Sequence, residues 1–514
     1  MVDFSGICIC SEHPAEPTIE PMDPPPLYRR LATHYLDAIR AGSLQPGDRL
    51  PSLRSLMRLH GISLSTALQL CRTLESDGWA QARERSGYFV RRPLRLAMAP
   101  MDEPAGRPPD PAQYLGVHEK VSQFIARRRQ GDVLLDLSNA RAAPALYPAE
   151  ALRAEMVRAL RQQPRLLTAT PPSRGRTPLR EAVAQRALQA GMTLSPEEVL
   201  PTNGCTEALN LALRAVAQPG DTVAVESPAF YGLLQVLESL GLRALEIPTS
   251  PQTGLSIEAL QMAIEAYGQL KAVVVVPHLQ NPLGSVMPDA HKQRLVQLCE
   301  AHAIALIEDD TYSALLEAEA PPRALKSFDR SGQVIHCASL HKILAPGLRL
   351  GWIAAGRWQA RVEMLKFAQT RNNEALPQWA AGRFMATSGY DRHLRRLREQ
   401  LRLQRERTAE AIAAFFPAGT RLNLPPGGLQ LWVELPAALS AAAVFDAALR
   451  ERILIAPGTL FSNSARFDHC LRINCGWPYT EALEDGLRRL GAIATQVCAA
   501  AAQPPLQSSS ARAA

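Results

Sequence analysis

The spacing of apolar residues changes along the chain near residue 131. Before that point, apolar side chains recur at helical spacing in three short segments between residues 27 and 76. After it, short β-branched runs alternate with longer amphipathic segments up to about residue 498. The runs are Val199–Pro201, Thr222–Glu226, Ala272–Pro277, Ile304–Glu308 and Val334–Ala338. This rhythm predicts an α/β unit with a largely parallel sheet covered by helices.

Three helices are predicted in the first part of the chain. The first covers Leu27–Ala41, whose apolar residues fall on one face. The second follows Ser52 and ends at Gly61, because a serine at a helix start can accept hydrogen bonds from the unpaired first-turn amides. The third begins after Ser63 or Ser65. Two short capped helices around a glycine turn predict a helix-turn-helix.

A hairpin is predicted directly after the third helix. Asp77-Gly78 turns the chain, and Trp79–Ala82 and Tyr88–Val90 have the composition of two short strands. The tip between them is basic, with Arg83 and Arg85. The first part of the chain is therefore predicted to be a winged helix-turn-helix.

Positive charge is concentrated in the same region. The whole chain has a net charge of +7, and residues 26–92 hold eleven arginines against five acidic residues. This concentration favours a polyanionic partner, and the helix-turn-helix makes double-stranded DNA the expected one, with the last helix entering the major groove. Phosphate contacts are predicted for Arg54, Arg58, Arg83 and Arg85, and groove contacts for Ser63, Ser65, Thr66 and Gln69.

This stretch resembles the GntR family of winged helix-turn-helix repressors. The resemblance rests on the strings PLYRRLATHYLDAIRAGSLQPGDRLPSLRSL and LESDGWAQARERSGYFV, in which glycines, prolines and caps fall in the family's order. The chain departs from the family at Leu64, where an arginine is usual. We expect Leu64 to pack in the core; the alternative is a contact with a thymine methyl group.

A lysine follows the end of a predicted strand in the second part of the chain. Lys342 comes shortly after Val334–Ala338, at the edge where α/β folds place their chemistry. Its amine can form a Schiff base with the aldehyde of pyridoxal 5'-phosphate (PLP). Ser339 and Arg349 flank it and can bind the cofactor phosphate. A second phosphate contact is predicted where a strand turns into a helix, at Gly204, Cys205 and Thr206.

Two further strand ends carry polar residues that suit the PLP ring. A carboxylate after Ile304–Glu308 can pair with the pyridine nitrogen and keep it protonated. Asp309 has the expected spacing of three residues before Tyr312, and Asp310 is the alternative. Tyr312 and Asn281 can each hydrogen-bond the phenolic oxygen of the ring.

The order of these segments resembles that of fold-type I PLP-dependent aminotransferases over about 365 residues. The resemblance implies that Phe230 stacks on the PLP ring and that Arg472 binds the carboxylate of an amino acid. The chain departs from the family at Thr170, where a tyrosine usually approaches the PLP of the neighbouring subunit, and at His341, where serine is common.

The two resemblances together point to the MocR subgroup of GntR-type regulators. That subgroup implies a head-to-tail homodimer with PLP sites near the subunit interface. We expect a transcriptional regulator in which PLP, alone or joined to an amino-acid-like effector, shifts DNA binding. The alternatives are an amino-acid aminotransferase with a secondary DNA-binding module and a cofactor-binding scaffold without gene control.

Composition limits the remaining possibilities. No stretch approaches the roughly 18 uncharged apolar residues of a membrane span, and the start lacks a signal-peptide pattern. The nine cysteines lack zinc-site spacing, so no metal and a cytoplasmic location are expected. The expected divisions are a disordered leader 1–25, the DNA-binding domain 26–92, a linker 93–130, the PLP-binding domain 131–498 with its small-domain part from about 370, and a disordered tail 499–514.

Overall fold

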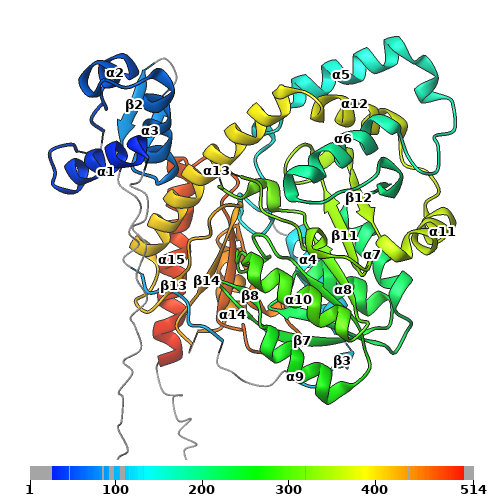
Figure 1. The fold of residues 1–514 in the computed structure, drawn as a ribbon. Helices are drawn as coiled ribbons and strands as arrows, with labels where there is room; N and C mark the ends of the chain where they lie inside the picture. Colours follow the sequence, from blue (N-terminus) through cyan, green and yellow to red (C-terminus); the bar gives the residue numbers. More distant parts are fainter. Residues whose placement is uncertain are drawn as a thin grey trace, which may run out of the picture. The chain divides into compact units, whose positions relative to one another are not determined.

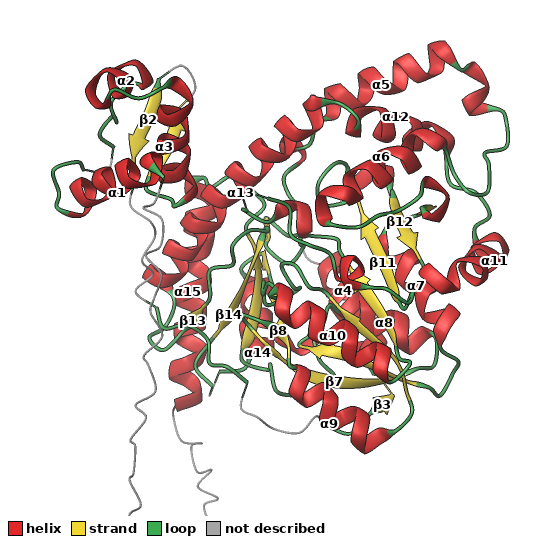
Figure 2. Ribbon diagram, in the orientation of Figure 1, coloured by secondary structure: helices red, strands yellow, loops and turns green. Residues whose placement is uncertain are grey.

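The computed structural model describes residues 26–45, 47–83, 86–91, 98–104, 110–114, 116–130, 132–318, 320–437 and 439–502. The chain divides into two compact units, Met1–Arg95 and Leu96–Ala514, drawn as ribbons in Figures 1 and 2. The predicted leader and residues 503–514 of the predicted tail lie outside the described residues.

The first unit has the predicted order of three helices and a hairpin. The Ser52 side chain accepts a hydrogen bond from the Ser55 amide at 3.2 Å and caps the second helix. Ser63, rather than Ser65, caps the third by accepting from the Thr66 amide at 3.2 Å. The elements are α1 (Leu27–Arg40), α2 (Leu53–His60), α3 (Leu64–Ser76), β1 (Ala80–Arg83) and β2 (Gly87–Val90), the two strands being antiparallel.

The core of this unit lies beneath α3. Ala67, Leu70 and Leu74 follow one another at helical spacing and are almost completely buried. They pack with Ile39 of α1 and Leu56 of α2. The three helices therefore share one small apolar core.

Leu70→Ala is expected to destabilise this unit by about 2–5 kcal/mol, because it removes a buried side chain and leaves a cavity. Leu70 is 1% exposed, whereas Leu59, on α2, is 68% exposed and provides a matched control. Hydrogen exchange of the α1–α3 amides in the full chain measures the change. Equal protection in Leu70→Ala and Leu59→Ala would contradict the packing described above.

The second unit is built on a mainly parallel sheet. Its strands run in the order β3-β7-β6-β9-β10-β11-β12-β5, with β8 paired to β7. The pairs from β7 through β11 are parallel, whereas β12 is antiparallel to both its neighbours. The strands are β3 (Gln113–Tyr114), β5 (Leu200–Thr202), β6 (Thr222–Ser227), β7 (Arg243–Ser250), β8 (Gly254–Leu255), β9 (Leu270–Val275), β10 (Ala305–Asp309), β11 (Val334–Ser339) and β12 (Gly351–Ala354).

Helices cover this sheet, as Figure 1 shows. Every residue of β6, β10 and β11 is buried, which is the pattern of strands covered on both faces. The sequence prediction of a mainly parallel, helix-covered sheet is thereby confirmed. The helices are α4 (Val117–Gln130), α5 (Ala149–Gln162), α6 (Thr177–Ala187), α7 (Cys205–Val216), α8 (Tyr231–Ser239), α9 (Ile257–Tyr267), α10 (Asp289–Ala301), α11 (Gln359–Gln369) and α12 (Ala375–Met385).

A smaller sheet follows the long helix α13 (Ser388–Phe415). Its strand order is β13-β14-β17-β16, and β15 pairs separately with β4 near the start of the unit. Helices α13 and α15 lie side by side (Figure 1). The remaining elements are β4 (Leu135–Asp136), β13 (Arg421–Leu422), β14 (Gln430–Glu434), α14 (Ala441–Arg450), β15 (Ile453–Leu454), β16 (Ala456–Pro457), β17 (Cys470–Asn474) and α15 (Glu481–Ala502). Helix α15 thus runs past Ala499, where the tail was expected to begin.

Part of the segment expected as a linker belongs to the second unit. Within it, β3 pairs with β7, and the amide of Val117 at the start of α4 donates to Glu238 at 2.8 Å. Asp110 forms an ion pair with Arg466 at 2.6 Å. These contacts join the segment to both the large sheet and the small domain.

Among the described residues, no helix combines the length and the apolar character needed to cross a membrane.

Candidate functional site

A cavity of about 320 Å³ lies at the carboxyl ends of the central strands. It is lined by all eleven residues that the sequence predicts for PLP and for the effector carboxylate. They come from loops and strand ends that are far apart along the chain, and parallel strands bring such ends to one edge of the sheet. The eleven are Gly204, Cys205, Thr206, Phe230, Asn281, Asp309, Tyr312, Ser339, Lys342, Arg349 and Arg472.

Lys342 follows β11 and presents its amine to this cavity. The amine donates a hydrogen bond to the Ala140 carbonyl and lies 5.9 Å from the centre of the Tyr312 ring. Burial lowers the pKa of Lys342 to about 7, and the charge of Arg472 adds to this effect, whereas Asp309 opposes it. An amine with this pKa is available as an uncharged nucleophile near neutral pH.

The rate at which Lys342 captures PLP is expected to rise with pH and to level off above about pH 8, because the neutral fraction of the amine is nearly complete there. A short lysine peptide, whose amine has its ordinary pKa near 10.4, should keep gaining rate over the same range. Both rates can be followed as the growth of visible absorbance after PLP is added. A protein rate that rises in parallel with the peptide rate would contradict the lowered pKa.

Asp309 lies at the end of β10 and faces the same cavity. Its carboxylate accepts hydrogen bonds from the Thr311 hydroxyl at 2.5 Å, the Thr311 amide at 3.1 Å and the Cys205 thiol at 3.2 Å. Burial raises the pKa of Asp309, and the neighbouring Asp310 charge adds to this. Asp310, the sequence-based alternative, does not line the cavity; it accepts from His278 and Ser313 instead.

The subsite predicted to bind a phosphate lies where β5 turns into α7. Gly204 has φ +80° and ψ 178°, a conformation that side chains disfavour. A Cβ on this residue would lie 3.5 Å from Nη2 of Arg349 and 3.8 Å from the Ser339 hydroxyl. The glycine therefore brings the start of α7 close to a guanidinium and a hydroxyl, which together suit a phosphate.

Asn281 connects the ring-facing and carboxylate-facing parts of the cavity. Its side-chain nitrogen donates to the Tyr312 hydroxyl at 3.3 Å, and its oxygen accepts from Arg472 at 3.0 Å. Arg472 also donates to the Ser138 carbonyl at 2.5 Å and is 1% exposed. Within the described part of the chain, no acidic side chain pairs with it. A buried guanidinium without an anionic partner is suited to a ligand carboxylate.

Phe230 borders the cavity at the start of α8. Its ring lies 4.9 Å from that of Tyr231, centre to centre. A Cβ on Gly232 would lie 2.5 Å from this ring, so the glycine leaves it room. The ring is thus available to stack on a flat ligand.

Several lining residues had no signal in the sequence. Ala140 and Arg141 reach the cavity from a loop that follows β4, and Tyr231 follows Phe230. His341 also lines it; burial lowers the pKa of His341 to about 4, with further contributions from the charges of Lys342 and Arg349. The sequence marked His341 as a departure from the aminotransferase family, without indicating that it lines the cavity.

The donor set fits PLP. The cavity is lined by four cationic side chains, Arg141, Lys342, Arg349 and Arg472, and by one acidic side chain, Asp309. A phosphate-bearing ligand with an aldehyde would offset this excess of positive charge and meet an amine of lowered pKa. The residues that line the cavity are therefore chemically complementary to PLP.

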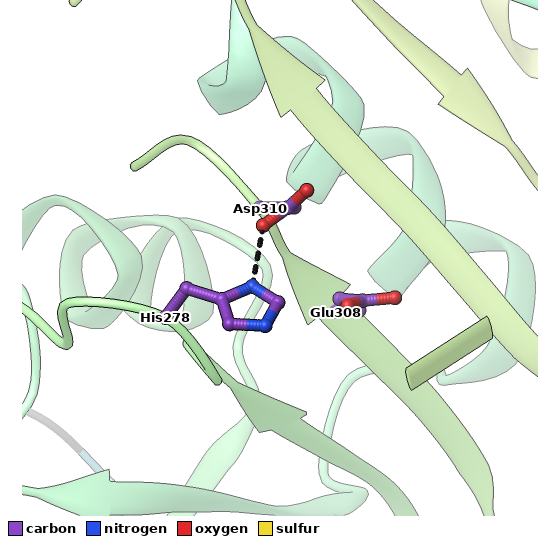
Figure 3. Close-up of side chains that lie close together, drawn as sticks. All are labelled: His278, Glu308 and Asp310. Carbon is purple, nitrogen blue, oxygen red and sulfur yellow. Dashed lines mark hydrogen bonds and ion pairs between the residues drawn. The ribbon is translucent and has the colours of Figure 1, made fainter. Parts of the chain in front are cut away.

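A separate cluster of His278, Glu308 and Asp310 has its ligand atoms within 4.8 Å of one another (Figure 3). Its carboxylates already accept hydrogen bonds: Asp310 from His278 at 2.8 Å, and Glu308 from two amides and from His336 at 3.1 Å. These hydrogen bonds hold the end of β10 in place and explain why the three side chains lie close together.

The side chains of six of the eight residues predicted to contact DNA lie in the described part of the first unit. Arg54 and Arg58 are exposed one turn apart on α2, and neither forms an ion pair with a described residue. At the start of α3, the Ser63 hydroxyl shares hydrogen bonds with those of Ser65 at 2.8 Å and Thr66 at 2.9 Å. Ser63 and Ser65 are exposed, whereas Thr66 and Gln69 are half-buried.

One prediction for this unit is wrong, and another falls on residues outside the described part of the chain. Leu64 is 56% exposed, so the expectation that it packs in the core is wrong. It is the first residue of α3, and helical side chains lean toward the amino end, so its side chain projects beyond the packed turns. Arg85 and the side chain of Arg83 lie outside the described residues.

Comparison with known proteins matches both units. Residues 135–490 match the family described as aminotransferase class I and II, and residues 27–90 match the bacterial regulatory proteins of the gntR family. The HTH-type transcriptional regulator YjiR of Escherichia coli (strain K12) is 36% identical over 471 residues, covering 90% of this chain and 98% of YjiR.

Solved structures resemble the second unit. The multiple substrate aminotransferase from Thermococcus profundus superposes with a TM-score of 0.69 at 25% identity, covering 74% of this chain and 96% of that protein. LysN, the alpha-aminoadipate aminotransferase of Thermus thermophilus, gives a TM-score of 0.67 at 27% identity and covers 75% of this chain and 100% of that protein. That structure holds N-(5'-phosphopyridoxyl)-L-leucine.

The first unit has the fold of a winged helix-turn-helix, and the fold and cavity of the second unit are of the PLP-dependent aminotransferase type. The chain belongs to the aminotransferase class I and II family and, through its gntR-family head, to the MocR type of transcriptional regulator.

Proposed function

We propose that this protein regulates transcription through PLP held on Lys342, and that an amino-acid-like effector entering the same cavity changes how the head binds double-stranded DNA. The observation that carries the proposal is the convergence of all eleven predicted residues on one cavity. The proposed domains are a DNA-binding head near residues 26–92 and a PLP-binding domain near 131–498, acting in the cytoplasm as a homodimer.

The residues have separate roles in this proposal. When bound, the cofactor supplies an aldehyde that captures amines and a ring that withdraws electrons. Lys342 holds the aldehyde, and Asp309 holds a proton on the ring nitrogen. Arg349, Ser339 and the first amides of α7 bind the phosphate.

The remaining residues orient the ring and the effector. Phe230 stacks on the ring, and Asn281 with Tyr312 hydrogen-bonds the phenolic oxygen. Arg472 binds the effector carboxylate, a role supported by its burial without an acidic partner. An effector can shift DNA binding only by as much as it binds one arrangement of the protein more tightly than another.

Footprinting on the DNA upstream of the protein's own gene tests the proposal. A protected site whose occupancy changes with PLP and again with an amino acid is the expected result. Arg472→Met should lose the response to the amino acid while keeping the response to PLP. A protection pattern that is identical with and without PLP would count against control by the cofactor.

A second candidate function is an amino-acid aminotransferase with a secondary DNA-binding module. Its support is that Lys342, Asp309 and Arg472, the residues such a reaction needs, line the same cavity. Mixing PLP-loaded protein with amino acids and 2-oxo acids separates the two functions. Rapid turnover favours the enzyme, and slow single conversions with tight operator binding favour the regulator.

A further inference from the structure

A second cavity, of about 160 Å³, lies beside the cofactor cavity. Thr311 and Ser339 line both cavities and form the wall between them. The rest of the lining comes from α6 and the segment after it, the loop after β10, β11 and the segment after it, β12, α12 and α13. Much of the wall is apolar, including Val183, Ala187, Met192, Ile343 and Leu394.

Three polar side chains in this wall have hydrogen-bonding capacity that no described residue uses. The Trp352 indole N–H is buried and has no hydrogen-bond partner among the described residues. Tyr390 is 3% exposed, and its contacts are between rings or with the Arg186 guanidinium rather than through its hydroxyl. Arg398 donates from Nε to the Ala314 carbonyl at 3.0 Å and forms no ion pair with a described residue.

The acidic groups of this wall are already engaged. Asp310 accepts from His278 and Ser313, each at 2.8 Å. Asp391 accepts from Arg186 at 2.8 Å. His336 is held by Glu308 at 3.1 Å; burial opposes its charged form, but the hydrogen bond and charge of Glu308 outweigh this and raise the pKa of His336. The cavity thus offers donors and a cation that no described residue uses, while each of its two carboxylates accepts at least one hydrogen bond, so the unused groups favour an anion.

The size of the cavity limits the ligand. An apolar cavity of roughly 150 Å³ in a protein is large enough for benzene, and this one is of similar volume. We propose that the second cavity binds a small aromatic or branched aliphatic monocarboxylate, with the carboxylate on Arg398 and Tyr390 and the apolar part against α6 and α13. An ammonium group on the ligand would be unfavourable where the proposal places the carboxylate, because it would meet the positive charge of Arg398.

A ligand bound in the second cavity would lie next to residues that also line the cofactor cavity. Thr311 donates to the Asp309 carboxylate through both its hydroxyl and its amide. Ser339 is adjacent to the subsite predicted to bind a phosphate at Gly204. A ligand in contact with these two residues would therefore bear on the groups proposed to hold the ring nitrogen and the phosphate, without entering the cofactor cavity.

Benzoate is the probe for the test, added to the full chain with and without PLP and followed by calorimetry and by tryptophan fluorescence. We expect benzoate to bind in both states, with benzylamine and benzyl alcohol much weaker, and the fluorescence change to disappear in Trp352→Phe. Binding to the PLP-free protein keeps this test independent of the proposed regulatory function.

Variants locate the bound probe. Arg398→Met should weaken benzoate binding about tenfold or more, because a hydrogen bond between charged groups is lost. Arg395→Met, at an exposed position of α13, is the matched control and should leave binding unchanged. Ala190→Phe, at a half-buried lining position, should block the cavity even if Arg398→Met folds poorly.

Arg472→Met separates the two cavities. Benzoate binding that survives this variant but is lost in Arg398→Met or Ala190→Phe supports the proposal. Binding that is lost in Arg472→Met and retained in the other two would place benzoate in the cofactor cavity and overturn the proposal. Absence of benzoate binding to the wild-type chain would also overturn it.

Discussion

Lys342→Ala is expected to abolish the visible absorbance that PLP gives with this protein and to remove all covalent retention of the cofactor. The reason is that aldehyde capture needs an uncharged amine inside the cavity, and Lys342 is the lysine among the cavity-lining residues. Reduction with borohydride followed by mass spectrometry measures the effect directly. The wild-type chain should carry the cofactor mass at position 342, and the variant should carry none.

Two controls make this result specific. Lys271→Ala removes an exposed lysine and should leave both absorbance and trapped mass unchanged. Lys342→Arg keeps a positive charge in the cavity but cannot capture the aldehyde, so it should behave like Lys342→Ala. A trapped cofactor on another lysine in the Lys342→Ala chain would show that the cavity has been assigned to the wrong amine.

Removing Arg54 and Arg58 together is expected to weaken DNA binding about a hundredfold at low salt, by the same factor for operator and unrelated sequences. Each exposed guanidinium is free of ion pairs with the described residues and can contribute a charged hydrogen bond to a phosphate. Because each phosphate contact releases counterions, the slope of log affinity against log salt should fall by about one for each arginine removed. Titrations of labelled duplexes at several salt concentrations measure both quantities.

Matched variants separate this charge effect from sequence recognition. Arg294→Ala removes an exposed arginine of α10, in the other unit, and should change neither affinity nor slope. Gln69→Ala should weaken binding to the operator while leaving unrelated duplexes unaffected. If the double arginine variant lost affinity for the operator alone, these residues would have a role in base reading rather than in phosphate binding.

The parts of the fold and site that were predictable from sequence are those with local signals. Ser52 and Ser63 cap helices, and capping depends on a residue and the three that follow it. Lys342 follows a buried strand, and parallel strands present their carboxyl ends at one edge of the sheet, so its place at that edge was predictable. The same rule accounts for the convergence of Asp309 and Gly204 on that edge.

Features that depend on distant pairing had no such signal. Ala140 accepts a hydrogen bond from Lys342, 202 positions away, and Ser138 accepts one from Arg472, 334 positions away. Asp110 meets Arg466 across 356 positions, within a stretch whose prolines indicated only a linker. Leu64 fits the apolar face of α3 by spacing, and only its place at the helix end explains its exposure.

The side chain of Asn281 has a nitrogen that gives a hydrogen bond to Tyr312 and an oxygen that takes one from Arg472. An anion that binds Arg472 would compete with Asn281 for the guanidinium and release the Asn281 oxygen, so the Asn281 amide group would be free to rotate. That rotation would change the hydrogen bond to the Tyr312 hydroxyl, so anion binding at Arg472 would affect Tyr312 through one side chain and without a change in the backbone.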